Sequence, residues 1–245
     1  MKVLGDTIYF LHGPENVARI WKYKTSITTP GVHTFVLIRV FGMAAKAVNM
    51  YNLDDSGIQS KPHPDSNVMP HNRIDHHTHV GFSKLLNGDR LPNLYLRWSQ
   101  NFARRLQALG IGDKWMESSD IMDFWMPPLT SSLNEAVAGP LLECVNPNFT
   151  RDFLNFLPFA HGLMKGLPNW CLPKASSLRA SLNRDVRQWQ AIARSRFRES
   201  DVDLDGDADP WWGSACVRER QKILLGVDNW DHDTAAASDF GLLWG

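Results

Sequence analysis

The sequence predicts a mainly α-helical protein with one short β-strand near its amino terminus. Apolar residues recur every three or four positions in several stretches longer than ten residues, which is the period of an amphipathic helix. β-Branched and aromatic residues follow one another as in a strand at 7–11 (TIYFL). The sequence shows no internal repeat and no low-complexity tract, so repeat architectures are not indicated.

The amino-terminal third is predicted to hold this strand, three helices and one long loop. Pro14 suits the first position of a helix at 15–24. Residues 25–33, with Pro30 and Gly31, are predicted to form a loop, and 35–50 a helix that breaks near Gly42. Residues 52–70 are polar and rich in Pro, Asp and Ser, which is typical of a long surface loop. A third helix is predicted at 73–86.

The middle of the chain contains three further predicted helices. The helix at 91–109 shows a clearer helical spacing of apolar residues than the helix at 73–86, and it ends at Gly110. Ser118 or Ser119 is a suitable cap for a helix at 120–137, which Pro127 and Pro128 are expected to kink or split. A helix at 151–164 is expected to be interrupted near Pro158.

The carboxy-terminal third has the longest predicted helix, 174–200, and two more at 211–225 and 231–245. The inward residues of the helix at 174–200 are Leu178, Leu182, Val186, Trp189, Ala193 and Phe197, and its outer face is rich in arginine. The stretch 231–245 begins with acidic residues and then turns apolar on nearly every side. We therefore expect it to be buried, and we expect the chain to lack the partners that bury it. On this interpretation, residues 1–245 are one incomplete domain, cut inside its central helix.

Composition excludes several classes of function. Lys and Arg together number 26, as do Asp and Glu, so no net charge favours nucleic acid. No run of about 18 apolar residues indicates a membrane span. Cys144, Cys171 and Cys216 are widely spaced and odd in number, which indicates a reducing compartment rather than a disulfide framework.

Two clusters could bind metal ions, but each has a simpler interpretation. Asp201, Asp203, Asp205 and Gly206 match the start of a calcium loop, yet Trp212 stands where the closing Glu should be. A solvated acidic connector is therefore favoured. The second cluster consists of Asp75, His76, His77 and His79, with His63 and His71 nearby. It lacks the i, i+4 histidine spacing typical of a zinc helix, so no metal site is predicted.

The order of motifs resembles the front half of a fungal cytochrome P-450, a heme-thiolate monooxygenase. The motifs are GDTIYFL, GPENVARIWK, Phe41-Gly42, DADPWWGS at 207–214 and AASDFGLLWG at 236–245. They are most similar to the branch of prostacyclin synthase and sterol 7-alpha-hydroxylase. The resemblance implies that the chain runs from the B helix (13–24) through the C helix (73–86) and G helix (174–200) into the early I helix (231–245).

The resemblance also implies a heme cofactor, although the chain lacks the family's cysteine loop for the axial ligand. The propionate side would be contacted by Arg73, His77 and His79. The substrate pocket would include Phe41, Phe240, Leu243, Trp244 and Gly245. No residue is assigned a catalytic role, and the chain is expected to be inactive alone.

By the same resemblance, the ligand would be a lipophilic small molecule and the partner an NADPH-dependent reductase. The family implies the cytosolic face of the endoplasmic reticulum, whereas a chain without an anchor is expected in the cytoplasm. The competing hypothesis is a stand-alone helical protein that binds or scaffolds a partner without catalysis.

Overall fold

The computed structural model describes residues 2–3, 6–7, 11–22, 30–87, 90–113, 115 and 117–244, and it is mainly helical. Two short strands, β1 (Lys2–Val3) and β2 (Asp6–Thr7), pair antiparallel. Of the strand predicted at 7–11, Thr7 ends β2, Leu11 is not in a strand, and 8–10 lie outside the described residues. The α-helices are α1 (Pro14–Lys22), α2 (Pro30–Arg39), α3 (Ala45–Leu53), α4 (Ile74–Leu86), α5 (Arg90–Ala108), α6 (Ile121–Ala138), α7 (Leu141–Val145), α8 (Phe149–Met164), α9 (Pro173–Arg196), α10 (Ala215–Leu224) and α11 (His232–Trp244). Short 3-10 helices are η1 (Pro70–Asn72), η2 (Asn169–Cys171) and η3 (Glu199–Asp201).

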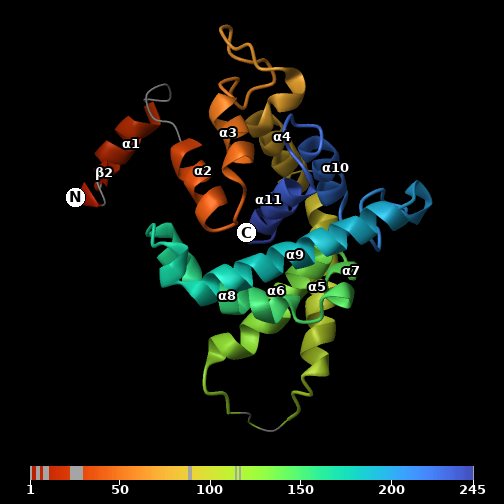
Figure 1. Ribbon diagram of the computed structural model, residues 1–245. Coiled ribbons are helices and arrows are strands. Elements are labelled where there is room, and N and C mark those ends of the chain that lie inside the picture. The colour runs from red at the N-terminus through yellow and green to blue at the C-terminus, as the bar shows by residue number, and fades with distance from the viewer. Residues whose placement is uncertain are drawn as a thin grey trace.

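Helix α9 crosses the middle of the fold and packs against α7, α8 and α11 (Figure 1). Its residues Leu182, Val186, Trp189 and Ala193 are fully buried, which confirms the predicted inward face. These positions are spaced by three or four residues, so they share one side of the helix. The indole Nε1 of Trp189 donates to the carbonyl of Trp211 at 2.8 Å. This helix is therefore the element on which the carboxy-terminal half is assembled.

Helix α11 is buried along most of its length, as its composition predicts. Residues from Thr234 to Phe240 are all buried, mainly against α9 and α2. The prediction that the chain lacks partners for this helix is wrong, because helices distant in sequence supply them. That residues 1–245 form an incomplete domain stays a prediction.

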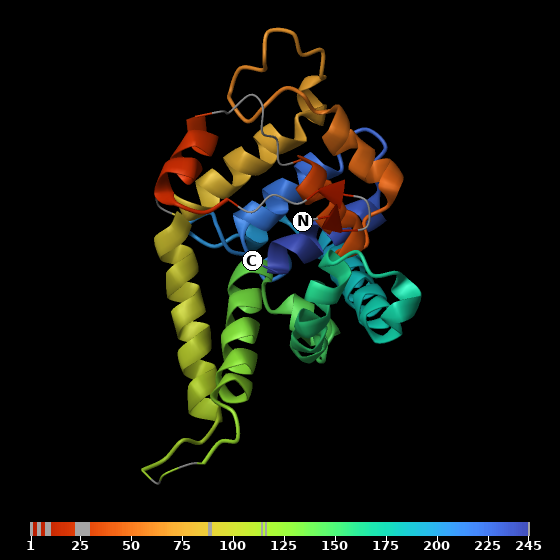
Figure 2. The ribbon, with the colours of Figure 1, turned by 90° about the vertical axis from the view of Figure 1, so that its left-hand side faces the viewer.

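Helices α5 and α6 form a long antiparallel hairpin that extends away from the other helices (Figure 2). Pro127 and Pro128 lie inside α6, and Pro158 lies inside α8, without splitting either helix. Each proline removes one backbone hydrogen bond, but α6 packs on α5, α7 and α8, and these contacts hold it together. The cap of α6 is Asp120, whose Oδ1 accepts from the N–H of Met122 at 2.7 Å, and not a serine.

Other boundaries differ from the prediction for local reasons. Helix α2 begins at Pro30, inside the predicted loop, and α7 was not predicted at all. The break near Gly42 is confirmed by the gap between α2 and α3. Residues 211–214 are a turn rather than helix, because Asp209 Oδ1 accepts from the N–H groups of Trp211 and Trp212 at 2.9 and 2.8 Å. The last predicted turn of α9 is instead the short helix η3.

Candidate functional site

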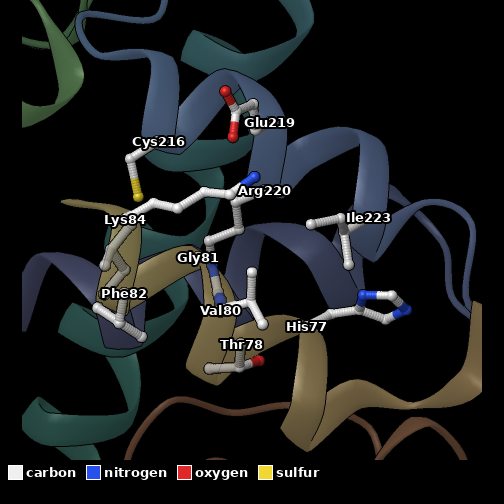
Figure 3. A pocket seen from close by; sticks show the side chains of 11 residues that line it. His77, Thr78, Val80, Gly81, Phe82, Lys84, Cys216, Glu219, Arg220 and Ile223 are labelled. Carbon is white, nitrogen blue, oxygen red and sulfur yellow. The ribbon is translucent and has the colours of Figure 1, made fainter. Parts of the chain in front are cut away.

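A small pocket lies between α4 and α10 (Figure 3). Its volume is about 150 Å³, and Leu242 of α11 completes its lining. Ligand sites for drug-sized molecules are typically about 300–1,000 Å³. The remaining lining residues are His77, Thr78, Val80, Gly81, Phe82, Lys84, Cys216, Glu219, Arg220 and Ile223. The pocket is therefore too small for a heme or a sterol-sized substrate.

Arg220 lies in the pocket wall and is held by groups behind it. Its Nε donates to Asp239 Oδ1 at 2.8 Å and its Nη2 to Ser238 Oγ at 2.7 Å. Oδ2 of Asp239 accepts from the amides of Gln190 and Gln221 at 2.9 and 2.5 Å. We call these five residues the α9–α10–α11 polar network. Burial raises the pKa of Asp239, and the cation and the hydrogen bonds to both carboxylate oxygens offset part of that cost.

Helix periodicity does not reveal this network, although the sequence contains a signal for it. Asp239 is the only charged residue between Thr234 and Trp244, in a stretch that is otherwise apolar or small. Charged residues are rarely buried unless they are paired. An aspartate on a helix predicted to be buried therefore indicates a cationic partner, but it does not indicate which one.

Cys216 points its sulfur into the same pocket (Figure 3) and is 6% exposed. Burial raises the pKa of its thiol to about 11. At pH 7 only about one thiol in ten thousand would then be ionised. Because the pocket beside its sulfur is too small for a heme, Cys216 does not fit the role of an axial heme ligand in this structure. Cys144 and Cys171 lie exposed, in α7 and η2.

Alkylation of the native protein should therefore distinguish its cysteines. With iodoacetamide at pH 8, we expect Cys144 and Cys171 to be modified rapidly and Cys216 to be protected, since it is buried and protonated. Peptide mass spectrometry over time measures each site, and unfolding in urea should abolish the difference. Equally fast modification of all three cysteines in the native protein would contradict this placement.

The three residues predicted to contact heme propionates do not converge on one point. Arg73 is buried and organises the loop before it: Nε donates to Ser56 Oγ at 3.1 Å and Nη1 to the carbonyl of Ser60 at 2.9 Å. Its Nη2 donates to the carbonyls of Gly57 and Gln59. With these donors engaged, Arg73 does not fit a propionate clamp in this structure.

His77 and His79 lie on different sides of α4. Positions that are two residues apart in a helix are separated by about 200° around its axis. His77 lines the pocket, and its Nε2 is 2.8 Å from the carbonyl of Pro70, whereas His79 is exposed. The set Arg73, His77 and His79 therefore does not form a heme clamp here.

The residues predicted to form the substrate wall are, in contrast, brought together. They are Phe41, Phe240, Leu243, Trp244 and Gly245, of which Gly245 lies outside the described residues. The ring centroids of Phe41 and Phe240 are 5.5 Å apart, and those of Phe41 and Trp244 are 5.7 Å apart. Both pairs are edge to face, a favoured aromatic geometry. These side chains pack against one another as part of the core.

Side chains of the acidic connector and of the histidine cluster form polar contacts with other parts of the protein. Asp203 Oδ1 accepts from the N–H groups of Asp207 and Ala208, and Asp207 pairs with Arg97 at 2.7 Å. His76 Nδ1 is 2.9 Å from the carbonyl of Ile58. Over the described ranges, no group of three His, Cys, Asp or Glu side chains could hold a metal ion. Nor is any described helix both long and apolar enough to span a bilayer.

Comparison with known proteins gives three relatives of one kind. The chain is 23% identical over 239 residues to the cytochrome P450 monooxygenase efuG of Hormonema carpetanum, covering 96% of this chain and 40% of that protein. It is 27% identical over 174 residues to fsoE of Humicola fuscoatra (70% and 30%), and 28% over 214 residues to calL of Penicillium decumbens (86% and 40%). Both are also cytochrome P450 monooxygenases.

The chain spans two fifths or less of the length of these relatives. No family model and no solved structure matches it. The three relatives nevertheless agree with one another, and each matches most of this chain. Their agreement accords with the mainly helical architecture and with the motif order noted in the sequence. The chain is thus similar to fungal cytochrome P450 monooxygenases over most of its own length.

Proposed function

We propose that the chain is part of a heme-dependent monooxygenase that oxidises a lipophilic substrate with O2, and that it does not catalyse this reaction by itself. The observation that carries the proposal is the similarity to three P450 monooxygenases over 70–96% of the chain. The heme, when bound, activates O2 through an axial thiolate in this class. The chain would contribute helices around the substrate, with an NADPH-dependent reductase as partner and the endoplasmic reticulum as its location.

Within this proposal, the apolar cluster around Phe41, Phe240, Leu243 and Trp244 would form a wall of the substrate site. Its chemistry supports an apolar ligand, since it offers aromatic faces and no charged group. The proposal assigns no proton transfer or bond-making step to Arg73, His77 or His79. Their contact with heme stays a prediction from the resemblance.

Purified chain mixed with hemin, reduced and exposed to carbon monoxide should not give the absorption band that names this family. The physical reason is that Cys216 is buried beside a pocket too small for a heme, while Cys144 and Cys171 lie on the surface. Difference spectroscopy measures the band, and full-length efuG is the positive control. A thiolate band from this chain that disappears in Cys216→Ser would contradict the proposed inactivity and identify the sulfur donor.

A second candidate, a helical binding protein without catalysis, is favoured by one specific observation. An open groove of about 810 Å³ lies between α5, α6 and α8, within the size range of ligand sites. Its walls include Met122, Met126, Pro127, Leu154 and Leu157. This groove is far larger than the pocket at Cys216, and it involves none of the residues predicted to contact heme.

A further inference from the structure

A separate cavity of about 330 Å³ lies between α9 and the amino-terminal half of α11. One wall is a broad face of α9 that carries Ser176, Arg179, Asn183, Arg184 and Arg187. Asp233, Ala236 and Ala237 of α11 form the opposite side. From the sequence, these arginines were predicted to be a solvated face. In the structure Arg184 and Arg187 are exposed, as predicted, and together with the half-buried Arg179 they line one open cavity.

The positive charge in this cavity is only partly neutralised. Arg187 pairs with Asp233 at 2.5 Å. In the part of the chain that the structure describes, no carboxylate forms an ion pair with Arg179 or Arg184. Arg179 instead donates to the carbonyl of Arg39, and Arg184 Nη2 lies 3.4 Å from Ser181 Oγ on the same helix. Arg184 does interact with the charge of the neighbouring Asp185, so Arg179 is the cation of the cavity wall that lacks a nearby carboxylate.

The positive charge of Arg179 is destabilised by its surroundings. Burial, and then the nearby charge of Arg39, lower the pKa of its guanidinium. Two like charges close together in a partly desolvated site repel each other, and an anion between α9 and α11 would relieve this repulsion. Guanidinium groups bind carboxylate and phosphate oxygens in two-pronged geometry, which makes them suited to such an anion.

Two buried polar atoms on the same wall have no hydrogen-bond partner. They are Oγ of Ser176 and Oδ1 of Asn183. The amide of Asn183 already donates to the carbonyls of Phe41 and Arg179 at 2.8 and 3.1 Å, so its oxygen is left as an acceptor. Ser176 offers a hydroxyl donor. Both atoms are fully buried, so a ligand in the open cavity does not reach them, and recognition there rests on the guanidinium groups.

We propose that this cavity binds a small oxyanion, such as a phosphate group or a dicarboxylate. Arg179 and Arg184 hold its charged oxygens. The site is independent of the proposed oxygen chemistry, because it shares no residue with the predicted heme and substrate contacts.

Isothermal titration calorimetry at low ionic strength tests this site with inorganic phosphate and, separately, with malate. We expect saturable binding of at least one anion to the unmodified chain. Arg184→Gln should weaken it by about tenfold or more, because a charge-assisted hydrogen bond is lost. Arg184 is exposed and bonds only within its own helix, so this variant is expected to fold normally.

Arg196→Gln is the matched control, since it removes the same charge from the same helix outside the cavity. It should leave the affinity within about twofold of the original. Binding of neither anion would overturn the proposal. Equal losses in the two variants would also overturn it, because they would show attraction to net charge alone. Loss in Arg184→Gln alone, with either anion, supports the site and identifies which oxyanion it prefers.

Discussion

Arg220→Ala should lower the free energy of unfolding by about 3–5 kcal/mol. The substitution leaves the carboxylate of Asp239, which is 1% exposed, buried without the cation that lies 2.8 Å from it. It also removes the donor to Ser238 Oγ and the cation above the ring of Phe82. Urea titration followed by circular dichroism measures the loss.

Two further variants separate this effect from the loss of any arginine. Arg187→Ala breaks an exposed ion pair with Asp233 and should cost less than about 1 kcal/mol. The double variant Arg220→Met with Asp239→Leu removes both charges and should recover much of the stability, since apolar replacements of buried pairs are often tolerated. If Arg220→Ala cost no more than Arg187→Ala, the α9–α10–α11 polar network would not stabilise the fold.

Gly213→Ala should destabilise the protein by about 2–5 kcal/mol, the sum of backbone strain and steric overlap. Gly213 has φ of 81°, a conformation that residues with a Cβ rarely adopt. A Cβ at this position would lie 2.1 Å from the backbone nitrogen of Gly139 and 2.4 Å from the carbonyl carbon of Ala138. Because these are backbone atoms, α6 and the turn before α10 would have to separate. Thermal unfolding gives the shift directly.

Gly206→Ala is the control for this prediction. Gly206 also has positive φ, 72°, but a Cβ there would meet no atom within 4 Å. Only the conformational cost should remain, about 1–2 kcal/mol. Similar losses in the two variants would show that contact between Gly213 and the end of α6 is not tight.

Helix positions and inward faces were largely predictable because they depend on local spacing. The residues of α9 that the pattern assigned to the core, Leu182, Val186, Trp189 and Ala193, are fully buried. The same logic predicted the burial of α11. Boundaries failed where one side chain redirected the backbone, as Asp209 does at the turn before α10.

The candidate sites were less predictable, because each depends on elements that meet only in the folded chain. Arg73 was expected to face a cofactor, yet it binds four groups in the loop that precedes it. The arginines of α9 were expected to face solvent, and Arg184 and Arg187 do, but the start of α11, some 50 residues away in sequence, forms the other side of an open cavity with them. Residue type and spacing identified the charges but not what lies opposite them.

The sequence by itself determined the helical class, the core faces of the long helices and the resemblance to fungal cytochromes P450. All three follow from periodicity and from the order of motifs along the chain. Only the tertiary structure decided what covers α11, which cation neutralises Asp239 and where the arginines of α9 point. The physical reason is that periodicity records which face of a helix is apolar, whereas pairing depends on how helices distant in sequence cross. Asp239 and Gln190, for example, are 49 residues apart along the chain but share a hydrogen bond of 2.9 Å.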